Sequence, residues 1–237
     1  PLIAALLAMG VPLAPVMAFW LASPLMDPSM FALTAGTLGY TFAVYKTGAA
    51  IAVGLIGGFG TRALMGSAAF ANPLRAGVGD GGCSASSVRA PGVVVWKFWE
   101  DDERRAKFAG SSLDNTLFLG KWLTVAFFLE SLMLAYIPAA LISSTIGGTG
   151  WLTVAGATLV GIPAYLNGYA ALPLVSGLIE QGMAPGAGMA FLLAGGVSSI
   201  PAALAVWALA RWPVFLAYIG FAIIGAFTMG LGFTFVV

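Results

Sequence analysis

Residues 18–28 read Ala-Phe-Trp-Leu-Ala-Ser-Pro-Leu-Met-Asp-Pro, and this interruption of an apolar segment decides the fold class. Pro24 and Pro28 lack a backbone N–H, and each disfavours helical geometry in the residue before it. The segment around them, residues 13–39, is otherwise apolar enough for a bilayer. A helix break at membrane depth is tolerated only where protein or a water-filled cavity satisfies the freed backbone groups. The stretch therefore predicts a broken membrane segment with a polar site at the break.

The pattern returns 172 residues later without a gap. With that offset Pro1 aligns with Pro173, Gly10 with Gly182, Gly58 with Gly230, and the sequence Met-Ala-Phe at 17–19 with the same sequence at 189–191. The second break is predicted at residues 195–201, Gly-Gly-Val-Ser-Ser-Ile-Pro. We therefore expect two internal repeats related by a pseudo-two-fold axis, each with a short helix, a broken or re-entrant segment and a full span. Parallel and inverted arrangements of the repeats both remain open at this point.

Composition places the chain in a membrane. Apolar residues make up 60% of the sequence and charged residues only 8%, whereas soluble domains carry about 25% charged residues. A bilayer core takes roughly 20 helical residues, and four apolar stretches are of that order: Tyr40–Phe59, Thr124–Ile146, Trp151–Ala171 and Phe215–Val237. The prediction is an all-α, polytopic transmembrane helical bundle.

The chain divides into three parts. Residues 1–60 form the first membrane repeat, residues 61–118 a central loop, and residues 119–237 a connecting span followed by the second repeat. The segment before the second repeat has its own predicted break, at Gly161–Pro163 and Asn167–Tyr169. Its counterpart would precede Pro1, so we expect at least one further span upstream.

Eight of the ten basic residues lie between Arg62 and Lys121, in the central loop and directly after it. Lys and Arg concentrate on the cytoplasmic side of membrane proteins, so we expect a cytoplasmic loop. Within it, Val93–Phe108 combines two Trp and a Phe with a run of mixed charge. That composition fits a helix lying at the membrane interface, and a solvated loop is the equal alternative.

Candidate pathway residues lie at the three breaks. They are Ser23, Pro24, Asp27 and Pro28 at the first, Ser198, Ser199 and Pro201 at the second, and Asn167 and Tyr169 at the third. Helix ends at such breaks present unpaired N–H and C=O groups to a substrate. The prolines can equally mark packed kinks without a ligand.

Two acids are candidates for coupling transport to an ion. Asp27 aligns with Ser199 under the repeat, and Glu130 lies inside a predicted span. An ionisable group at membrane depth is costly and usually functional. The alternatives are an N-cap or interfacial turn for Asp27, and pairing with the backbone or a lysine for Glu130. We expect Asp27 and Ser199 to face each other across a polar cavity.

Several function classes lack their motifs. The sequence has no phosphate-binding loop, dinucleotide fingerprint or catalytic triad. It has no His and one Cys, Cys83, which excludes an ordinary zinc site. The formal net charge of +1 gives no reason to expect a nucleic-acid partner. We therefore expect neither an enzyme nor a bound cofactor or metal.

The residues at the breaks resemble a bacterial permease family of the organoarsenical-efflux type, many of whose members are only "predicted permeases". The resemblance rests on residues 1–28 and on residues 161–201, which contain Gly-Ile-Pro-Ala-Tyr, Leu-Pro-Leu and Ala-Phe-Leu-Leu-Ala-Gly. Such permeases typically have Asn before the Pro at both breaks, where this chain has Asp27 and Ser199. They also tend to carry Cys near Asn167, and this chain has none there. Since trivalent arsenic and soft metals favour thiolates, these departures put such substrates in doubt.

The predicted function is a permease of the bacterial inner membrane, a multi-pass secondary transporter for efflux of a small inorganic or organometalloid solute or a metal ion. The alternative is a channel-like or structural membrane subunit without coupled transport. The expected partners are the lipid bilayer and a small solute, and homo-oligomerisation is open.

Overall fold

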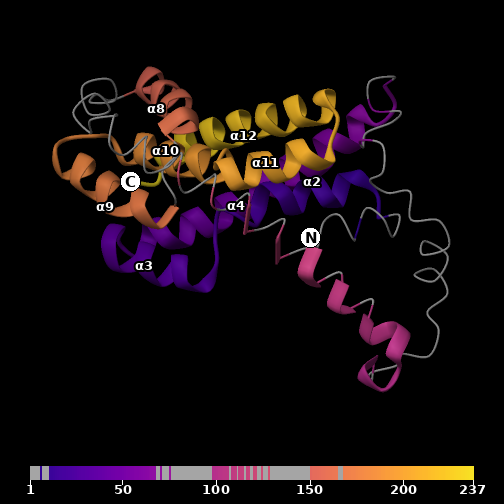
Figure 1. The fold of residues 1–237 in the computed structure, drawn as a ribbon. Coiled ribbons are helices and arrows are strands. Elements are labelled where there is room, and N and C mark those ends of the chain that lie inside the picture. The colour runs from indigo at the N-terminus through magenta and orange to yellow at the C-terminus, as the bar shows by residue number, and fades with distance from the viewer. Residues whose placement is uncertain are drawn as a thin grey trace.

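The computed structural model describes residues 6, 11–67, 70, 75, 98–106, 108–110, 112–114, 116–117, 120–121, 124, 128, 150–164 and 168–237. The regular elements of this part are helices, which confirms the all-α prediction there (Figure 1). In chain order they are α2 (Leu13–Ala22), α3 (Pro28–Leu38), α4 (Tyr40–Leu64), the 3-10 turn η2 (Phe98–Glu100), α8 (Trp151–Ala164), α9 (Gly168–Glu180), α10 (Pro185–Val197), α11 (Ile200–Leu209) and α12 (Trp212–Phe233).

The first break, here break 1, covers residues 23–27, as the prolines predict. Helix α2 ends at Ala22, and α3 starts at Pro28 with Asp27 as its N-cap. Proline suits the first helical position because the N–H that it lacks has no intrahelical partner there. At the other end of α3, Gly39 has φ 94°, a left-handed conformation open to glycine. The chain therefore passes from α3 into α4 through a single residue.

The second break, here break 2, is shorter than predicted. Helix α10 continues through the Gly195-Gly196 pair to Val197, leaving only Ser198 and Ser199 before α11. Both glycines are buried, so tertiary packing outweighs their weak helix propensity. The part of the third break predicted at Gly161–Pro163 is helical instead, because α8 runs through both residues to Ala164. A proline in the last turn of a helix removes only one hydrogen bond of the ladder.

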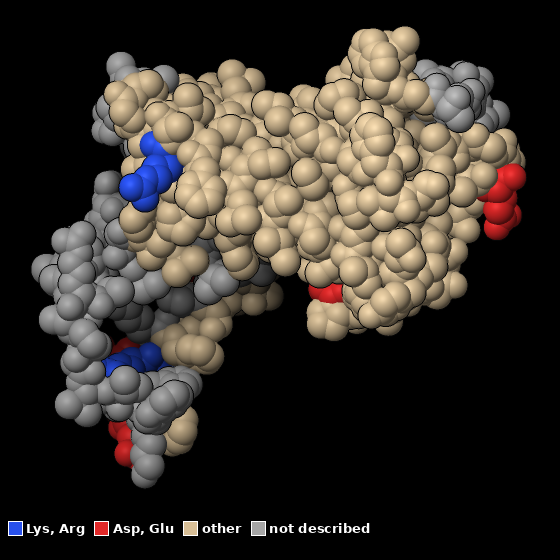
Figure 2. Space-filling model, turned by 180° about the vertical axis from the view of Figure 1, so that it is seen from behind, with Lys and Arg blue, Asp and Glu red and all other residues tan. Residues whose placement is uncertain are grey.

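Helices α4 and α12 are the two described helices long and apolar enough to cross a bilayer. They correspond to the predicted spans 40–59 and 215–237. The predicted span 124–146 lies almost wholly outside the described residues. Helix α4 exposes a stripe of apolar side chains: Val44, Ile51, Leu55 and Phe59. In the view of Figure 2 most of the bundle surface is uncharged.

The two long helices pack against each other in antiparallel directions. The Tyr45 hydroxyl near the start of α4 donates to the Met229 carbonyl near the end of α12, at 3.0 Å. In the middle, Val53 lies against Gly225, and towards the end of α4, Gly60 lies against Phe221. Residues further along α4 thus contact residues progressively earlier in α12, as antiparallel packing requires.

Each long helix has a shorter companion. Helix α2 packs along α4 and α10 packs along α12. A Cβ on Gly58 would lie 3.2 Å from Ala18 Cβ and 3.4 Å from the Ala14 carbonyl oxygen. On the other pair, a Cβ on Gly230 would lie 2.5 Å from Ala190 Cβ and 2.8 Å from the Gly186 carbonyl oxygen. Small residues therefore bring both pairs of backbones together.

The helix starts obey the same offset as the sequence. Helices α2, α3 and α4 begin at 13, 28 and 40, and α10, α11 and α12 begin at 185, 200 and 212, in each case 172 residues later. The glycine contacts obey it too, because Gly58, Ala18 and Ala14 correspond to Gly230, Ala190 and Gly186.

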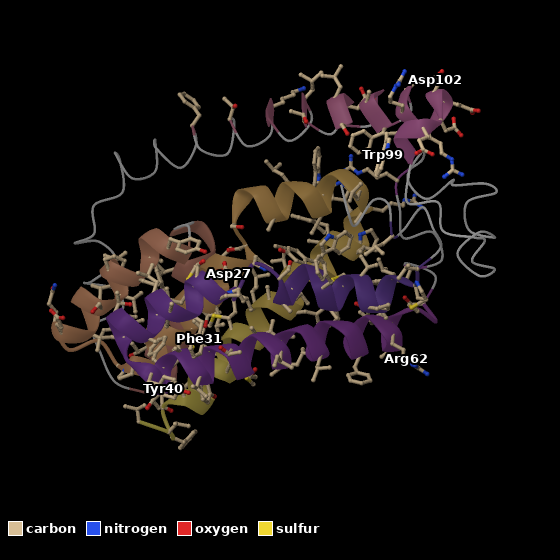
Figure 3. All side chains as sticks on the ribbon, turned by 90° about the horizontal axis from the view of Figure 1, so that it is seen from below. Asp27, Phe31, Tyr40, Arg62, Trp99 and Asp102 are labelled. Carbon is tan, nitrogen blue, oxygen red and sulfur yellow. The ribbon has the colours of Figure 1, made fainter. Side chains whose placement is uncertain are left out.

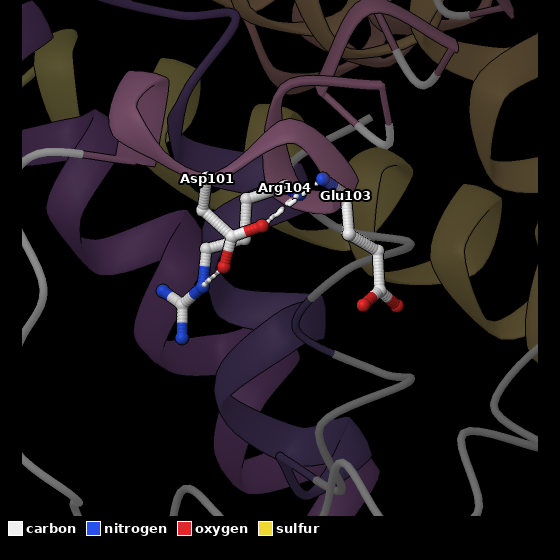
Figure 4. A network of polar contacts seen from close by, with 3 residues as sticks. All are labelled: Asp101, Glu103 and Arg104. Atoms are coloured by element: carbon white, nitrogen blue, oxygen red, sulfur yellow. Dashed lines mark hydrogen bonds and ion pairs between the residues drawn. The ribbon is translucent and has the colours of Figure 1, made fainter.

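Part of the central segment is described, and it lies apart from the bundle (Figure 1). Asp101 Oδ1 accepts the backbone N–H groups of Glu103 and Arg104 at 3.0 and 3.2 Å, and Asp101 Oδ2 lies 3.6 Å from Arg104 Nε (Figure 4). Asp101 thus acts as an N-cap for the helical turn that follows. Trp99 and Phe108 are more than half exposed, and the interfacial location of this segment stays a prediction.

Candidate functional site

The two breaks meet inside the bundle. A Cβ on Gly196, in the last turn of α10, would lie 3.0 Å from the Leu25 Cδ2 methyl and 3.7 Å from the Pro24 carbonyl oxygen. Pro24 and Gly196 are themselves separated by 172 residues, as are Val53 and Gly225. In both places a residue lies against its counterpart, so the candidate site forms where the two halves of the chain touch.

Asp27 is the polar centre of break 1. Its Oδ1 accepts the Met30 backbone N–H at 2.9 Å and its Oδ2 accepts the Tyr169 hydroxyl at 2.8 Å. The N-cap alternative considered from the sequence is therefore present, and a second bond from another helix is added to it. Both donors stabilise the ionised carboxylate. The Asp27 side chain remains exposed on the outside of these bonds, and Figure 3 shows it at the junction of the two helices of the broken segment.

Tyr169 reaches Asp27 because α9 packs on α3. Gly168, the residue before Tyr169, comes so close that a Cβ there would lie 2.7 Å from Met30 Cε. Ser176 extends the contact, donating to the Thr37 carbonyl at 3.4 Å. Tyr169 of the predicted third break is thus brought to Asp27 of break 1, a pairing that the sequence did not predict.

Break 2 is neutral in the described structure. The Ser198 hydroxyl bonds to the carbonyls of Ala194 at 2.8 Å and Ile162 at 3.2 Å, which joins break 2 to the end of α8. Ser199 is half-buried at the N-cap position of α11, with no hydrogen bond from its side chain to that helix. The buried Tyr218 hydroxyl donates to the Val197 carbonyl at the end of α10.

The other predicted residues have varied settings. Ser23 is exposed, Pro24 half-buried and Pro28 exposed at the start of α3, while Pro201 lies in the first turn of α11. Asn167 and Glu130 lie outside the described residues. That Asp27 and Ser199 share one cavity stays a prediction.

Sequence reasoning missed Lys46. This lysine lies in α4 with 1% of its surface exposed, and the Asp27 charge acts on it electrostatically. The signal was present, since Lys46 is the single charged residue within the predicted span Tyr40–Phe59. A charge inside a membrane span is by default a functional candidate.

A family model described as "Predicted permease" (ArsP_1) matches residues 1–169 and again residues 115–237. The chain belongs to this family. Membership indicates a membrane transporter, in agreement with the resemblance seen in the sequence. The chain is also 28% identical over 132 residues to the UPF0718 protein MJ0584 of Methanocaldococcus jannaschii. That match covers 56% of this chain and 36% of the relative, so the chain spans little more than a third of the curated relative's length. No solved structure matches the permease.

The permease has a separate hollow at one end of the bundle, with a volume of about 570 Å³. It is lined by the junctions of α3 with α4 and of α9 with α10, including Thr37, Tyr40, Ser176 and Glu180. Thr37, its lining residue nearest to Asp27 in the sequence, lies ten positions further along α3, a distance of roughly 15 Å along the helix. The hollow contains no residue of the breaks.

Proposed function

We propose that this permease is a secondary transporter whose substrate passes between the two broken segments, with Asp27 as the residue that couples transport to an ion. The observation that carries the proposal is the Asp27–Tyr169 hydrogen bond, because it joins a carboxylate at a helix break to a third helix at the contact between the two halves. Broken helices at the contact of repeats typically hold the substrate in transporters.

We further propose that the halves form an inverted repeat. Two observations support it: equivalent residues meet at Val53–Gly225 and Pro24–Gly196, and α4 runs antiparallel to its counterpart α12. If both helices cross the bilayer, they cross it in opposite directions. Alternating access in such folds moves one part against another around a fixed site.

Efflux from a bacterial cell of a small inorganic or organometalloid solute is the transport direction and substrate class that we propose. The lack of a thiol near the breaks weighs against soft metals. The competing function, a channel-like or structural subunit, predicts no dependence of flux on Asp27 or on a proton gradient.

The test of the proposed site is the substitution Tyr169→Phe. It removes one hydrogen bond to a charged group, worth about 1.5–3 kcal/mol, so we expect proton-driven transport in everted vesicles to fall about tenfold. Uptake of arsenite, a methylated trivalent arsenical and phosphate would be measured with the full-length protein. Tyr40→Phe is the matched control, because Tyr40 is 70% exposed and lies at the start of α4, at the end of α3 that is remote from Asp27. Equal activity of the two variants would contradict the site.

The cytoplasmic location of the central loop is supported by the charge at the bundle ends. Arg75 bonds to the Leu209 and Ala210 carbonyls beside Arg211, and the antiparallel packing brings the α4 end that carries Arg62 to the same side. Glu180 lies at the opposite end, with the hollow. On the bundle itself, Figure 2 shows basic side chains at one end and acidic side chains towards the other. The basic end is expected to face the cytoplasm.

A labelling experiment tests this orientation. An impermeant maleimide added to intact cells should leave native Cys83 unmodified and should label it only after permeabilisation. The control is Thr41→Cys in a Cys83→Ser background, since Thr41 is exposed at the opposite end of α4 and should label from outside. Labelling of Cys83 in intact cells would reverse the orientation.

A further inference from the structure

Lys46 carries a charge that the described protein does not neutralise directly. Its side chain is 1% exposed, yet no carboxylate of the described residues lies within 4.0 Å of its ammonium, and no hydrogen bond joins it to them. A buried ammonium normally requires both a counter-charge and acceptors.

The packing register places Lys46 at break 1. Gly58 of α4 faces Ala14 and Ala18, whereas Gly54, about one turn earlier, faces Ala18 and Ala22. Lys46 lies about two turns before Gly54 in α4. The same distance along the neighbouring helix α2, towards its end, leads past Ala22 into break 1. The electrostatic interaction between Asp27 and Lys46 agrees with this position of Lys46 beside break 1.

Asp27 does not serve as a direct partner for Lys46. Its two oxygens accept the Met30 N–H and the Tyr169 hydroxyl, and it forms no ion pair with Lys46 within 4.0 Å. A second donor near break 1 is also without an acceptor: the buried indole N–H of Trp20, in the last turn of α2. Lys46 and the Trp20 indole are therefore two donors, at or next to break 1, for which the described residues supply no acceptor.

The second half of the chain lacks this charge. The residue 172 positions after Lys46 is Tyr218, whose hydroxyl is satisfied by the Val197 carbonyl. Val197 in turn is the counterpart of Leu25 in break 1. A neutral, bonded hydroxyl thus stands where the first half has an ammonium. The charge is specific to break 1 and is not required by the helix packing common to both halves.

We propose that the site at break 1 takes a small anion, a carboxylate or an oxyanion, with the Lys46 ammonium as its counter-charge. This rests on the proposed function and names its substrate class. An anion would supply the acceptors that Lys46 and the Trp20 indole lack. A metal cation would have to enter beside the Lys46 ammonium, which in a site of low dielectric is strongly unfavourable. Lys46 thus selects against the cationic substrates that the sequence left open.

The test measures the charge preference of the site without requiring transport. Ser29→Cys, in a Cys83→Ser background of the full-length protein, places a thiol in the exposed first turn of α3. Its reaction rates with an anionic sulfonate methanethiosulfonate and with the cationic trimethylammonium analogue are compared as a ratio. We expect Lys46→Met to lower the anion-to-cation ratio at least about tenfold, whereas Lys46→Arg retains it. Thr37→Cys, exposed near the far end of α3, is the control and should not respond.

An unchanged ratio in folded Lys46→Met, or a thiol at 29 that reacts with neither reagent, would overturn the anion site. Should the Lys46→Met variant fail to reach the membrane, the ratio at position 29 is compared with that at position 37 in the protein that keeps Lys46. A higher ratio at 29 supports the proposal and an equal or lower ratio overturns it. If the ratio behaves as expected while Tyr169→Phe leaves transport intact, the anion site stands and the coupling role of the Asp27–Tyr169 pair falls.

Discussion

Asp27→Asn is expected to reduce proton-driven transport by at least about a hundredfold, which corresponds to about 2.7 kcal/mol. The amide cannot take up and release a proton, so a residue that couples transport through its carboxylate loses that ability entirely. The expected loss exceeds that of Tyr169→Phe, because the phenylalanine variant keeps the carboxylate and its bond to the Met30 N–H. The measurement is uptake into everted vesicles under an imposed pH gradient.

The structural role of Asp27 can be separated from this charge effect. Asn is as good an N-cap as Asp, so Asp27→Asn keeps an acceptor for the Met30 N–H and should leave the thermal stability in detergent nearly unchanged. Asp27→Ala removes the cap as well and should cost about 1 kcal/mol of stability. Asp27→Asn protein with full coupled transport would show Asp27 to be only a cap, and Glu130 would then be the coupling candidate to examine.

The sequence predicted the outline of the fold because its main signals are local. Pro24 and Pro28 mark break 1, and the gap-free offset gives the start of every helix from α10 to α12 once α2 to α4 are placed. Glycines were less reliable: Gly195 and Gly196 are both buried and remain helical, and break 1 packs on Gly196. Local propensity alone contains no information about that contact.

The candidate site was predictable only in part, for the same reason. Asp27 and Tyr169 were each selected, yet their hydrogen bond joins residues 142 positions apart and follows from the packing of α9 on α3. Lys46 was visible as a charge within an apolar span, but its burial beside break 1 depends on the register between α2 and α4. Pairings of this kind are set by tertiary structure.

The second large effect is expected for Gly230→Ala, which should destabilise the protein by about 1–3 kcal/mol. The added methyl would lie 2.5 Å from Ala190 Cβ and 2.8 Å from the Gly186 carbonyl oxygen, both on the buried face of α10. Neither atom belongs to a flexible side chain, so the two helices have to move apart. The shift would reach break 2, because α10 ends there.

Two further glycines make the prediction quantitative by comparison. Gly58→Ala, at the equivalent position of the first half, meets Ala18 Cβ at 3.2 Å and the Ala14 carbonyl oxygen at 3.4 Å, so its cost should be smaller. Gly220→Ala, also in α12, meets nothing within 4 Å and should be neutral or stabilising by up to about 1 kcal/mol, the usual advantage of Ala in a helix. Unfolding in mixed micelles, followed by loss of helical circular dichroism, should rank the three variants with Gly230→Ala least stable and Gly220→Ala most stable. Gly58 and Gly230 occupy equivalent positions, but a Cβ at Gly230 would meet its neighbours at shorter distances. A reversed order of stability would therefore mean that the close approach of α10 and α12 does not determine the cost of the added methyl.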